Sequence, residues 1–273
     1  MSTESLHSRS SVPRALTIAG SDSGGGAGIQ ADVKTFQELG AFGMSAITAV
    51  TAQNTIGVQA VYPLSPEAVH EQIRSIGQDI GVDALKTGML FSSEIIEAVA
   101  ASLKAFKWKR VVVDPVMIAK GGSVLLQEAA LNAFKRELLP LAEVVTPNIP
   151  EAERLSGILI RNAAEKREAA RRLAALGVQY VVLKGGHESG AEAVDLLYDG
   201  SSFCEFAAER IDTVHTHGTG CTFSAALTAG LAHGLAVEPA VRQAKAFIQA
   251  AIEHGIAVGS GIGPTNHWAY RLQ

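Results

Sequence analysis

Short hydrophobic runs that are rich in β-branched residues alternate with amphipathic segments along nearly the whole chain. The hydrophobic runs predict strands at 14–19, 43–52, 83–87, 110–114, 144–146 and 180–184. Between them, apolar residues recur at helical spacing, as at Ile29, Val33, Phe36 and Leu39 or at Val69, Ile73, Ile76 and Ile80. Further helices are expected at 93–106, 127–138, 163–176, 219–234 and 238–255. This alternation predicts an α/β fold with a mostly parallel sheet and helices on both faces.

The pattern runs on without a Pro/Ser-rich linker, a shift in composition or an internal repeat. We therefore expect one domain over residues 13–273. Residues 1–12 differ from the rest, because they are rich in Ser, Thr and charge and carry no apolar period. They are expected to form a disordered N-terminal tail.

Composition narrows the class of protein. Hydrophobic residues make up 47% of the 273 residues and charged residues 18%, which allows a large buried core. The net charge of −4 argues against a nucleic-acid partner. No signal-peptide pattern and no apolar stretch of ~20 residues is present, so we expect a cytoplasmic protein with no membrane partner. Two cysteines, Cys204 and Cys221, are too few for a disulfide framework.

A first glycine-rich loop, Gly20–Gly28, runs directly into a helix. Glycines let the backbone approach a ligand, and the amides at a helix start attract anions or polar groups. The loop is not a Walker loop, and it fits the dinucleotide fingerprint poorly. It is either a ligand loop or a flexible turn. Asp32, in the first turns of the helix, is either a solvated residue or a carboxylate that faces substrate.

A second glycine-rich loop, Thr216–Thr222, also opens a long helix. Its Gly-Thr-Gly sequence predicts a cradle of backbone N–H groups, where the helix dipole would stabilise charge on a transferring phosphoryl group. Cys221 stands at the helix start, where the dipole is expected to lower the pKa of its thiol. A turn and cap without function is the alternative interpretation.

Polar residues also follow three of the predicted strands. Asp114 ends one strand, while Asn148 and Glu151 begin a helix after the next; this set suits water-mediated Mg²⁺ binding, although Asn148 and Glu151 could instead form a capping box. Lys184 is followed by Gly-Gly-His187 and could face a nucleotide phosphate or be an ordinary loop charge. Because the carboxyl ends of parallel strands share one edge, these residues are expected to converge.

Several strings occur together and in order. They are Ala19–Asp32, Gly43–Thr55, Lys86–Leu90, Asp114–Met117, Thr146–Asn148, Lys184–His187, His217–Cys221 and Gly263–His267. As an ordered set, over about residues 14 to 268, they resemble the thiamine branch of the ribokinase-like superfamily, the hydroxymethylpyrimidine and phosphomethylpyrimidine kinases.

The resemblance implies a three-layer α/β/α sandwich and phosphorylation by ATP with Mg²⁺. The implied substrate is 4-amino-5-hydroxymethyl-2-methylpyrimidine and then its monophosphate, giving the pyrophosphate used in thiamine assembly. It also implies a homodimer. These statements rest on the family and not on the composition or the periodicity.

The resemblance assigns roles residue by residue. It implies a substrate pocket of Gly20, Asp32, Gln53, Met89 and Val116, with Gln53 on the aminopyrimidine edge. It implies catalysis at Cys221, with an anion hole at Gly218 and Gly220. It implies ATP binding by Asn148, Lys184 and Thr219, and a Mg²⁺ site at Asp114, Asn148 and Glu151. For Cys221 we favour positioning and charge stabilisation over base catalysis, because a loose phosphoryl-transfer transition state needs little base assistance.

Other functions compete with this one. Cysteine-bearing relatives can phosphorylate pyridoxal, which is also a six-membered ring with a hydroxymethyl group. A catalytically silent nucleotide- or vitamer-binding regulator is a second alternative, although all the expected phosphate-site residues are present. A dinucleotide-dependent dehydrogenase is disfavoured by the first loop. Residues Gly121 to Ser123 are expected to form a flap over the substrate.

Overall fold

The computed structural model describes residues 12–117, 126–127, 129–188 and 190–272. The predicted tail, apart from Val12, and the predicted flap at Gly121 to Ser123 lie outside the described residues.

The strands of the described residues form one nine-stranded sheet in the order β3-β2-β1-β4-β5-β6-β7-β8-β9. They are β1 (Arg14–Asp22), β2 (Phe42–Asn54), β3 (Gly57–Pro63), β4 (Ala84–Thr87), β5 (Val111–Val113), β6 (Val144–Val145), β7 (Tyr180–Leu183), β8 (Glu192–Tyr198) and β9 (Phe203–Glu209). The six neighbouring strands β2, β1, β4, β5, β6 and β7 are parallel, as predicted. β3 at one edge and β8 and β9 at the other pair antiparallel, and the periodicity did not indicate them.

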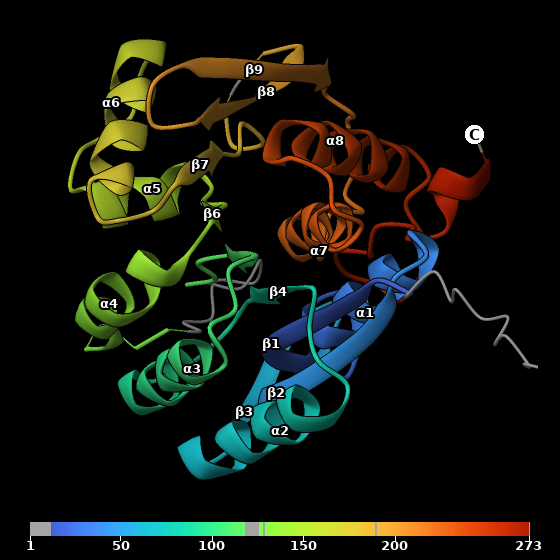
Figure 1. The fold of residues 1–273 in the computed structure, drawn as a ribbon. Coiled ribbons are helices and arrows are strands. Elements are labelled where there is room, and N and C mark those ends of the chain that lie inside the picture. Colours follow the sequence, from blue (N-terminus) through green and yellow to red (C-terminus); the bar gives the residue numbers. More distant parts are fainter. Residues whose placement is uncertain (1–11, 118–125, 128, 189, 273) are drawn as a thin grey trace, which may run out of the picture.

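Helices cover both faces of the sheet. They are α1 (Gly28–Glu38), α2 (Pro66–Asp79), α3 (Ser93–Phe106), α4 (Ala130–Ala133), α5 (Ile149–Ser156), α6 (Ala163–Ala174), α7 (Thr219–Ala232) and α8 (Val237–Glu253), with short η1 (Phe134–Leu138), η2 (Leu139–Leu141) and η3 (Ala269–Leu272). Figure 1 shows α2 to α6 along one side of the sheet and α1, α7 and α8 along the other. The predicted three-layer arrangement is confirmed.

The two cores follow from the alternation of side chains along each strand. In β5, Val111 and Val113 pack into the core beneath α2 to α6, whereas Val112 packs with Phe223 of α7 on the opposite face. Because both faces are buried, the central strands are apolar without interruption. Within the described ranges, no helix is long and apolar enough to cross a membrane.

Candidate active site

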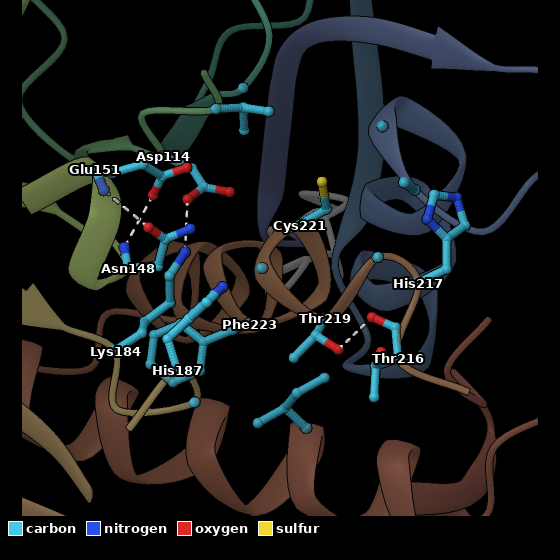
Figure 2. A pocket seen from close by; sticks show the side chains of 18 of the residues that line it. Asp114, Asn148, Glu151, Lys184, His187, Thr216, His217, Thr219, Cys221 and Phe223 are labelled. Carbon is cyan, nitrogen blue, oxygen red and sulfur yellow. Dashed lines mark hydrogen bonds and ion pairs between the residues drawn. The ribbon is translucent and has the colours of Figure 1, made fainter. Parts of the chain in front are cut away.

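A cavity of about 530 Å³ lies at the carboxyl ends of the parallel strands. Its walls come from the end of β2, from the loops after β1, β4, β5, β6 and β7, and from the first turn of α7. In Figure 2, Asp114, Asn148, Glu151 and Lys184 gather on one side of that turn, and His217 lies on the other. The shared sheet edge thus brings together side chains from distant parts of the chain.

With one exception, the residues predicted from the sequence line this cavity: Gly20, Gln53, Met89, Asp114, Val116, Asn148, Glu151, Lys184, Gly218, Thr219, Gly220 and Cys221. The exception is Asp32, which is fully buried in α1. Its carboxylate accepts hydrogen bonds from Lys86 Nζ at 2.7 Å and from Thr17 Oγ1 at 2.6 Å. The expectation of a carboxylate that faces substrate is therefore corrected, since Asp32 faces a buried lysine instead.

The two glycine-rich loops meet at Gly218. This residue has a φ of 81°, and a Cβ atom there would collide with the carbonyl oxygen of Gly26. Only glycine therefore allows both the left-handed backbone and the close approach of the first loop. Gly218 precedes α7, and Thr219 closes the turn by donating its hydroxyl to the Thr216 carbonyl at 2.7 Å. The first turn of α7, from Gly218 to Cys221, thus lines the cavity.

Asp114 and Lys184 form an ion pair at the wall of the cavity. Lys184 Nζ lies 2.9 Å from Asp114 Oδ1, and Thr146 and Ser224 each donate a hydroxyl to the same carboxylate at 3.2 Å. Burial opposes ionisation of Asp114, but Lys184 and Lys86 outweigh it and hold its pKa below the ordinary value. Asp114 is therefore a carboxylate at neutral pH, and Lys184 remains an ammonium.

Asn148 and Glu151 form the capping box of α5. The Asn148 side chain accepts from the Glu151 amide, and Glu151 accepts from the Asn148 amide, both at 2.9 Å. Glu151 also lines the cavity and is only 8% exposed. Burial raises the pKa of Glu151 to about 7. The nearby Asp114 carboxylate acts in the same direction, and the Lys184 ammonium acts in the opposite direction. The two interpretations of this motif are compatible, because the capping residues also present oxygen atoms near Asp114.

Cys221 lies in the first turn of α7 and lines the cavity. Burial raises the pKa of its thiol to about 11, although Lys86 and a backbone hydrogen bond with Gly28 act in the opposite direction. The expected lowering of this pKa is wrong, because desolvation by the surrounding protein exceeds the effect of the helix start. The group presented at neutral pH is therefore a thiol.

Asp22 and His217 are site residues that the sequence interpretation missed. His217 Nε2 lies 2.8 Å from Asp22 Oδ2 and 3.3 Å from Gln53 Nε2. Asp22 also accepts from the amides of Gly24, Gly26 and Ala27, which fixes the first glycine-rich loop. The available signal was the position of Asp22 at the end of the first strand.

The loop after β7 is held by a second set of side chains that the sequence analysis did not predict. Arg210 donates to the carbonyls of Gly185, Gly186, Gly190 and Glu192. The Gly185 amide donates to Asp195, which also pairs with Lys245 at 2.9 Å. Arg210, Asp195 and Lys245 all line the same end of the cavity as Lys184. Asp195 lies in β8, Arg210 directly after β9 and Lys245 in α8, so no local sequence motif indicated them.

The chain resembles known proteins over nearly its full length. A family model described as phosphomethylpyrimidine kinase matches residues 22–266. A hydroxymethylpyrimidine/phosphomethylpyrimidine kinase of Bacillus subtilis (strain 168) is 52% identical over 262 residues, which cover 96% of this chain and 97% of that relative. A pyridoxine kinase of the same organism is 48% identical over 266 residues, covering 96% and 98%.

The solved structures agree. The ADP complex of Bacillus subtilis pyridoxal kinase matches with a TM-score of 0.89 and 46% identity, covering 96% of this chain and 100% of that chain. The ribokinase-like fold, the kinase activity and the family indicated by the sequence motifs are thereby confirmed. The chain belongs to the phosphomethylpyrimidine kinase family.

Proposed function

We propose that this kinase transfers the γ-phosphoryl group of ATP to 4-amino-5-hydroxymethyl-2-methylpyrimidine and then to the resulting monophosphate. One observation carries the proposal: a single cavity joins Gln53 and Met89 at one end to Lys184 and the first turn of α7 at the other. It therefore has room for a small ring and a nucleotide side by side. The 52% identity to a kinase named for these two pyrimidines supports the same substrates.

The ring would lie between the two loops near β1 and β2. Thr51 donates its hydroxyl to Gln53 Oε1 at 3.1 Å. This hydrogen bond helps to fix the orientation of the Gln53 side-chain amide. Gly20 keeps this end open, because a Cβ atom there would approach the Met89 methyl group to 3.0 Å. A polar amide beside an apolar wall suits an aminopyrimidine, whose edge forms hydrogen bonds and whose faces are apolar.

In the proposed reaction, the hydroxymethyl oxygen forms a bond to the γ-phosphorus. The bond from that phosphorus to the β,γ-bridging oxygen breaks, ADP leaves, and the hydroxyl proton passes to solvent. The amides at Gly218 to Cys221 and the Lys184 ammonium would stabilise the charge on the transferring group. With a thiol pKa of about 11, Cys221 would act by positioning and hydrogen bonding rather than as a ready thiolate base. The second transfer would use a phosphate oxygen of the monophosphate as the nucleophile.

The residues also fit the Mg²⁺ that accompanies ATP. Asp114 and Glu151 are buried carboxylates close enough for Asp114 to raise the pKa of Glu151, so a divalent cation would relieve their repulsion. Within the parts of the chain that the structure describes, no cluster of three or more His, Cys, Asp or Glu side chains could hold a metal directly. We therefore propose that Asp114, Asn148 and Glu151 hold the ion partly through water. Bound there, it would neutralise phosphate charge.

A second candidate is phosphorylation of a vitamin B6 alcohol. The 48% identity to a pyridoxine kinase and the similarity to a pyridoxal kinase structure favour it. The same phosphoryl-transfer machinery would serve both ring types, so only the ring end of the cavity distinguishes them.

We also propose a homodimer that pairs through the β2–β3 edge. Val50 and Tyr62 lie opposite each other in this antiparallel pair and are 43% and 63% exposed, and Ile56 at the turn is 71% exposed. Exposed apolar side chains at the edge of a sheet are typical of a surface that a second subunit covers.

Mass spectrometry of the reaction products tests the proposed function. Wild-type protein with MgATP and the hydroxymethylpyrimidine should yield the monophosphate first and the diphosphate later. Cys221→Ala should lower kcat at least ~100-fold while the Kd for ADP changes less than about threefold. Product formation from pyridoxine alone would instead establish the second candidate.

A further inference from the structure

Lys86 and Asp32 form an ion pair that is completely shielded from solvent. Lys86 lies in β4 and Asp32 in α1, and both side chains have 0% exposure, with Nζ 2.7 Å from Oδ1. Burying such a pair removes two charges from water, and the attraction between them often fails to repay that loss. Apolar side chains of similar size would fill the same space at no greater cost in stability. The pair therefore calls for a reason other than stability.

The position of Lys86 suggests that reason. Its ammonium lies 3.4 Å from the carbonyl oxygen of Cys221, in the first turn of α7. Lys184 lies against the same turn from the cavity side, next to Gly220. The turn that presents Cys221 is thus flanked by two ammonium groups, one at the cavity wall and one behind it. Each is held by its own carboxylate, Asp114 for Lys184 and Asp32 for Lys86.

Both lysines, each paired with a carboxylate, add positive charge beside the start of a helix. The first turn of a helix already carries positive potential, because its amide N–H groups have no partner within the helix. A buried cation beside it adds to that potential in a medium that screens poorly. An anion that lies at the helix start would be stabilised by both the amides and the two ammonium groups. A transferring phosphoryl group is such an anion.

We propose that Lys86 is a positioning residue of the phosphoryl-transfer site: held by Asp32, it fixes the turn that bears Cys221 and supplies the site with a second, permanently buried positive charge. This inference rests on the proposed function, since it assigns Lys86 to the same phosphoryl transfer. It also gives Asp32 a role through Lys86, in place of the contact with substrate expected from the sequence.

The charges around Cys221 make this proposal measurable. Lys86 from β4 favours its thiolate, whereas Asp32 from α1 and Asp114 after β5 disfavour it; Lys184 after β7 also faces it. Burial opposes the charged form of Lys86, but Asp32, Cys221 and Asp114 outweigh this and raise its pKa, so Lys86 stays charged over the working range. Loss of the cation should therefore make the Cys221 thiol harder to ionise.

The test uses Lys86→Met and the double variant Lys86→Met/Asp32→Asn, both in a Cys204→Ser background. Cys204 is the other cysteine of the chain, so this background leaves Cys221 as the sole target of iodoacetamide. The double variant replaces the ion pair by two neutral side chains of similar size, which protects the fold where the single variant leaves Asp32 unpaired. Circular dichroism and thermal unfolding identify the folded variants.

The proposal predicts that kcat falls roughly 10- to 100-fold while both KM values stay within about threefold. In Lys86→Met, the rate of Cys221 alkylation at pH 8.5 should fall about tenfold, since the loss of a nearby cation raises a thiol pKa by roughly one unit or more. In the double variant this fall should be smaller, because Asp32, which disfavours the thiolate, is lost as well. A folded double variant with wild-type kcat would overturn the proposal, as would a folded Lys86→Met variant with wild-type alkylation. Faster alkylation would also overturn it, because a merely structural pair would expose the thiol when removed. Alkylation needs neither ATP nor pyrimidine, so its outcome is independent of whether the proposed substrates are turned over.

Discussion

The Lys184 ammonium lies 2.9 Å from the Asp114 carboxylate, where β7 and β5 end at the wall of the cavity. The pair is 14% and 2% exposed, so water screens it little. With Glu151 beside it, the cluster presents one cation and two carboxylates to the space assigned to the phosphates of ATP. The first two predictions follow from the charges of this cluster.

Lys184→Met should lower kcat/KM for ATP roughly 10- to 100-fold, because hydrogen bonds to charged groups contribute about 1.5–3 kcal/mol. The KM for the pyrimidine should change little. Initial rates of ADP release, measured with each substrate varied in turn, check this prediction. The matched control is Lys104→Met on α3, an exposed lysine that pairs with Glu137 and is absent from the cavity lining. Equal losses in the two variants would show that Lys184 has no special relation to the nucleotide.

Glu151 predicts a pH dependence of Mg²⁺ use. Its pKa is raised to about 7, so the carboxylate that would help to hold the ion is lost as the pH falls through that value. The Mg²⁺ concentration for half-maximal activity should therefore rise by roughly tenfold between pH 8 and pH 6, as the ionised fraction falls. Titrations of activity with Mg²⁺ at each pH measure it. Glu151→Gln should remove most of this dependence; if the variant keeps the wild-type profile, another group is responsible.

His267 predicts a loss of stability in mild acid. The ring is 3% exposed, its Nε2 lies 3.1 Å from Thr222 Oγ1, and burial lowers its pKa to about 4. Between this value and the unfolded pKa of about 6.5, the unfolded chain binds a proton that the folded chain does not. Stability should therefore fall by about 2 kcal/mol from pH 7 to pH 5 on account of this group.

Urea unfolding of wild type and His267→Gln at several pH values separates this contribution. The variant is expected to be less stable at pH 7 but to lose less stability on acidification. Parallel pH profiles for the two proteins would mean that His267 does not carry the effect.

Tyr62→Asp should convert the proposed dimer to monomer, because it places a charge in the apolar patch of the β2–β3 edge. Sedimentation velocity of wild type and variant measures the change. Leu159→Asp is the control, since Leu159 is 59% exposed and lies outside that edge. A monomeric wild-type protein, or a dimer that survives Tyr62→Asp, contradicts the proposed interface.

The parallel part of the sheet was predictable because its strands are apolar on both faces and alternate with amphipathic helices. β8 and β9 were not predictable, because Glu192, Glu205 and Glu209 interrupt their apolar residues. The alternation of apolar and polar positions that would indicate a strand is therefore weak. β3 at the sheet edge carries a similarly weak signal, because none of its residues is buried and no alternation of buried and exposed positions develops. These strands matter for function, since Asp195 and the nearby Arg210 brace the Lys184 loop.

A site residue was predictable where a charged residue at the end of a predicted strand was enough to identify it, as for Asp114 and Lys184. The prediction failed where the contact that decides a residue's role comes from a residue far away in the sequence. Asp32 carries no local sign that Lys86 pairs with it, and Lys86 itself looked like part of a short strand. For Cys221, the local signal of a helix start pointed to a lowered pKa, whereas burial by distant segments decides the direction.

The most direct test of the central claim is kcat/KM, measured by ADP release from MgATP, for the hydroxymethylpyrimidine, its monophosphate and pyridoxal in parallel. We predict turnover of both pyrimidines, with values for pyridoxal at least ~10-fold lower, since discrimination between rings of similar size in one pocket amounts to about 1–3 kcal/mol. Turnover of pyridoxal with neither pyrimidine accepted would contradict the proposed function.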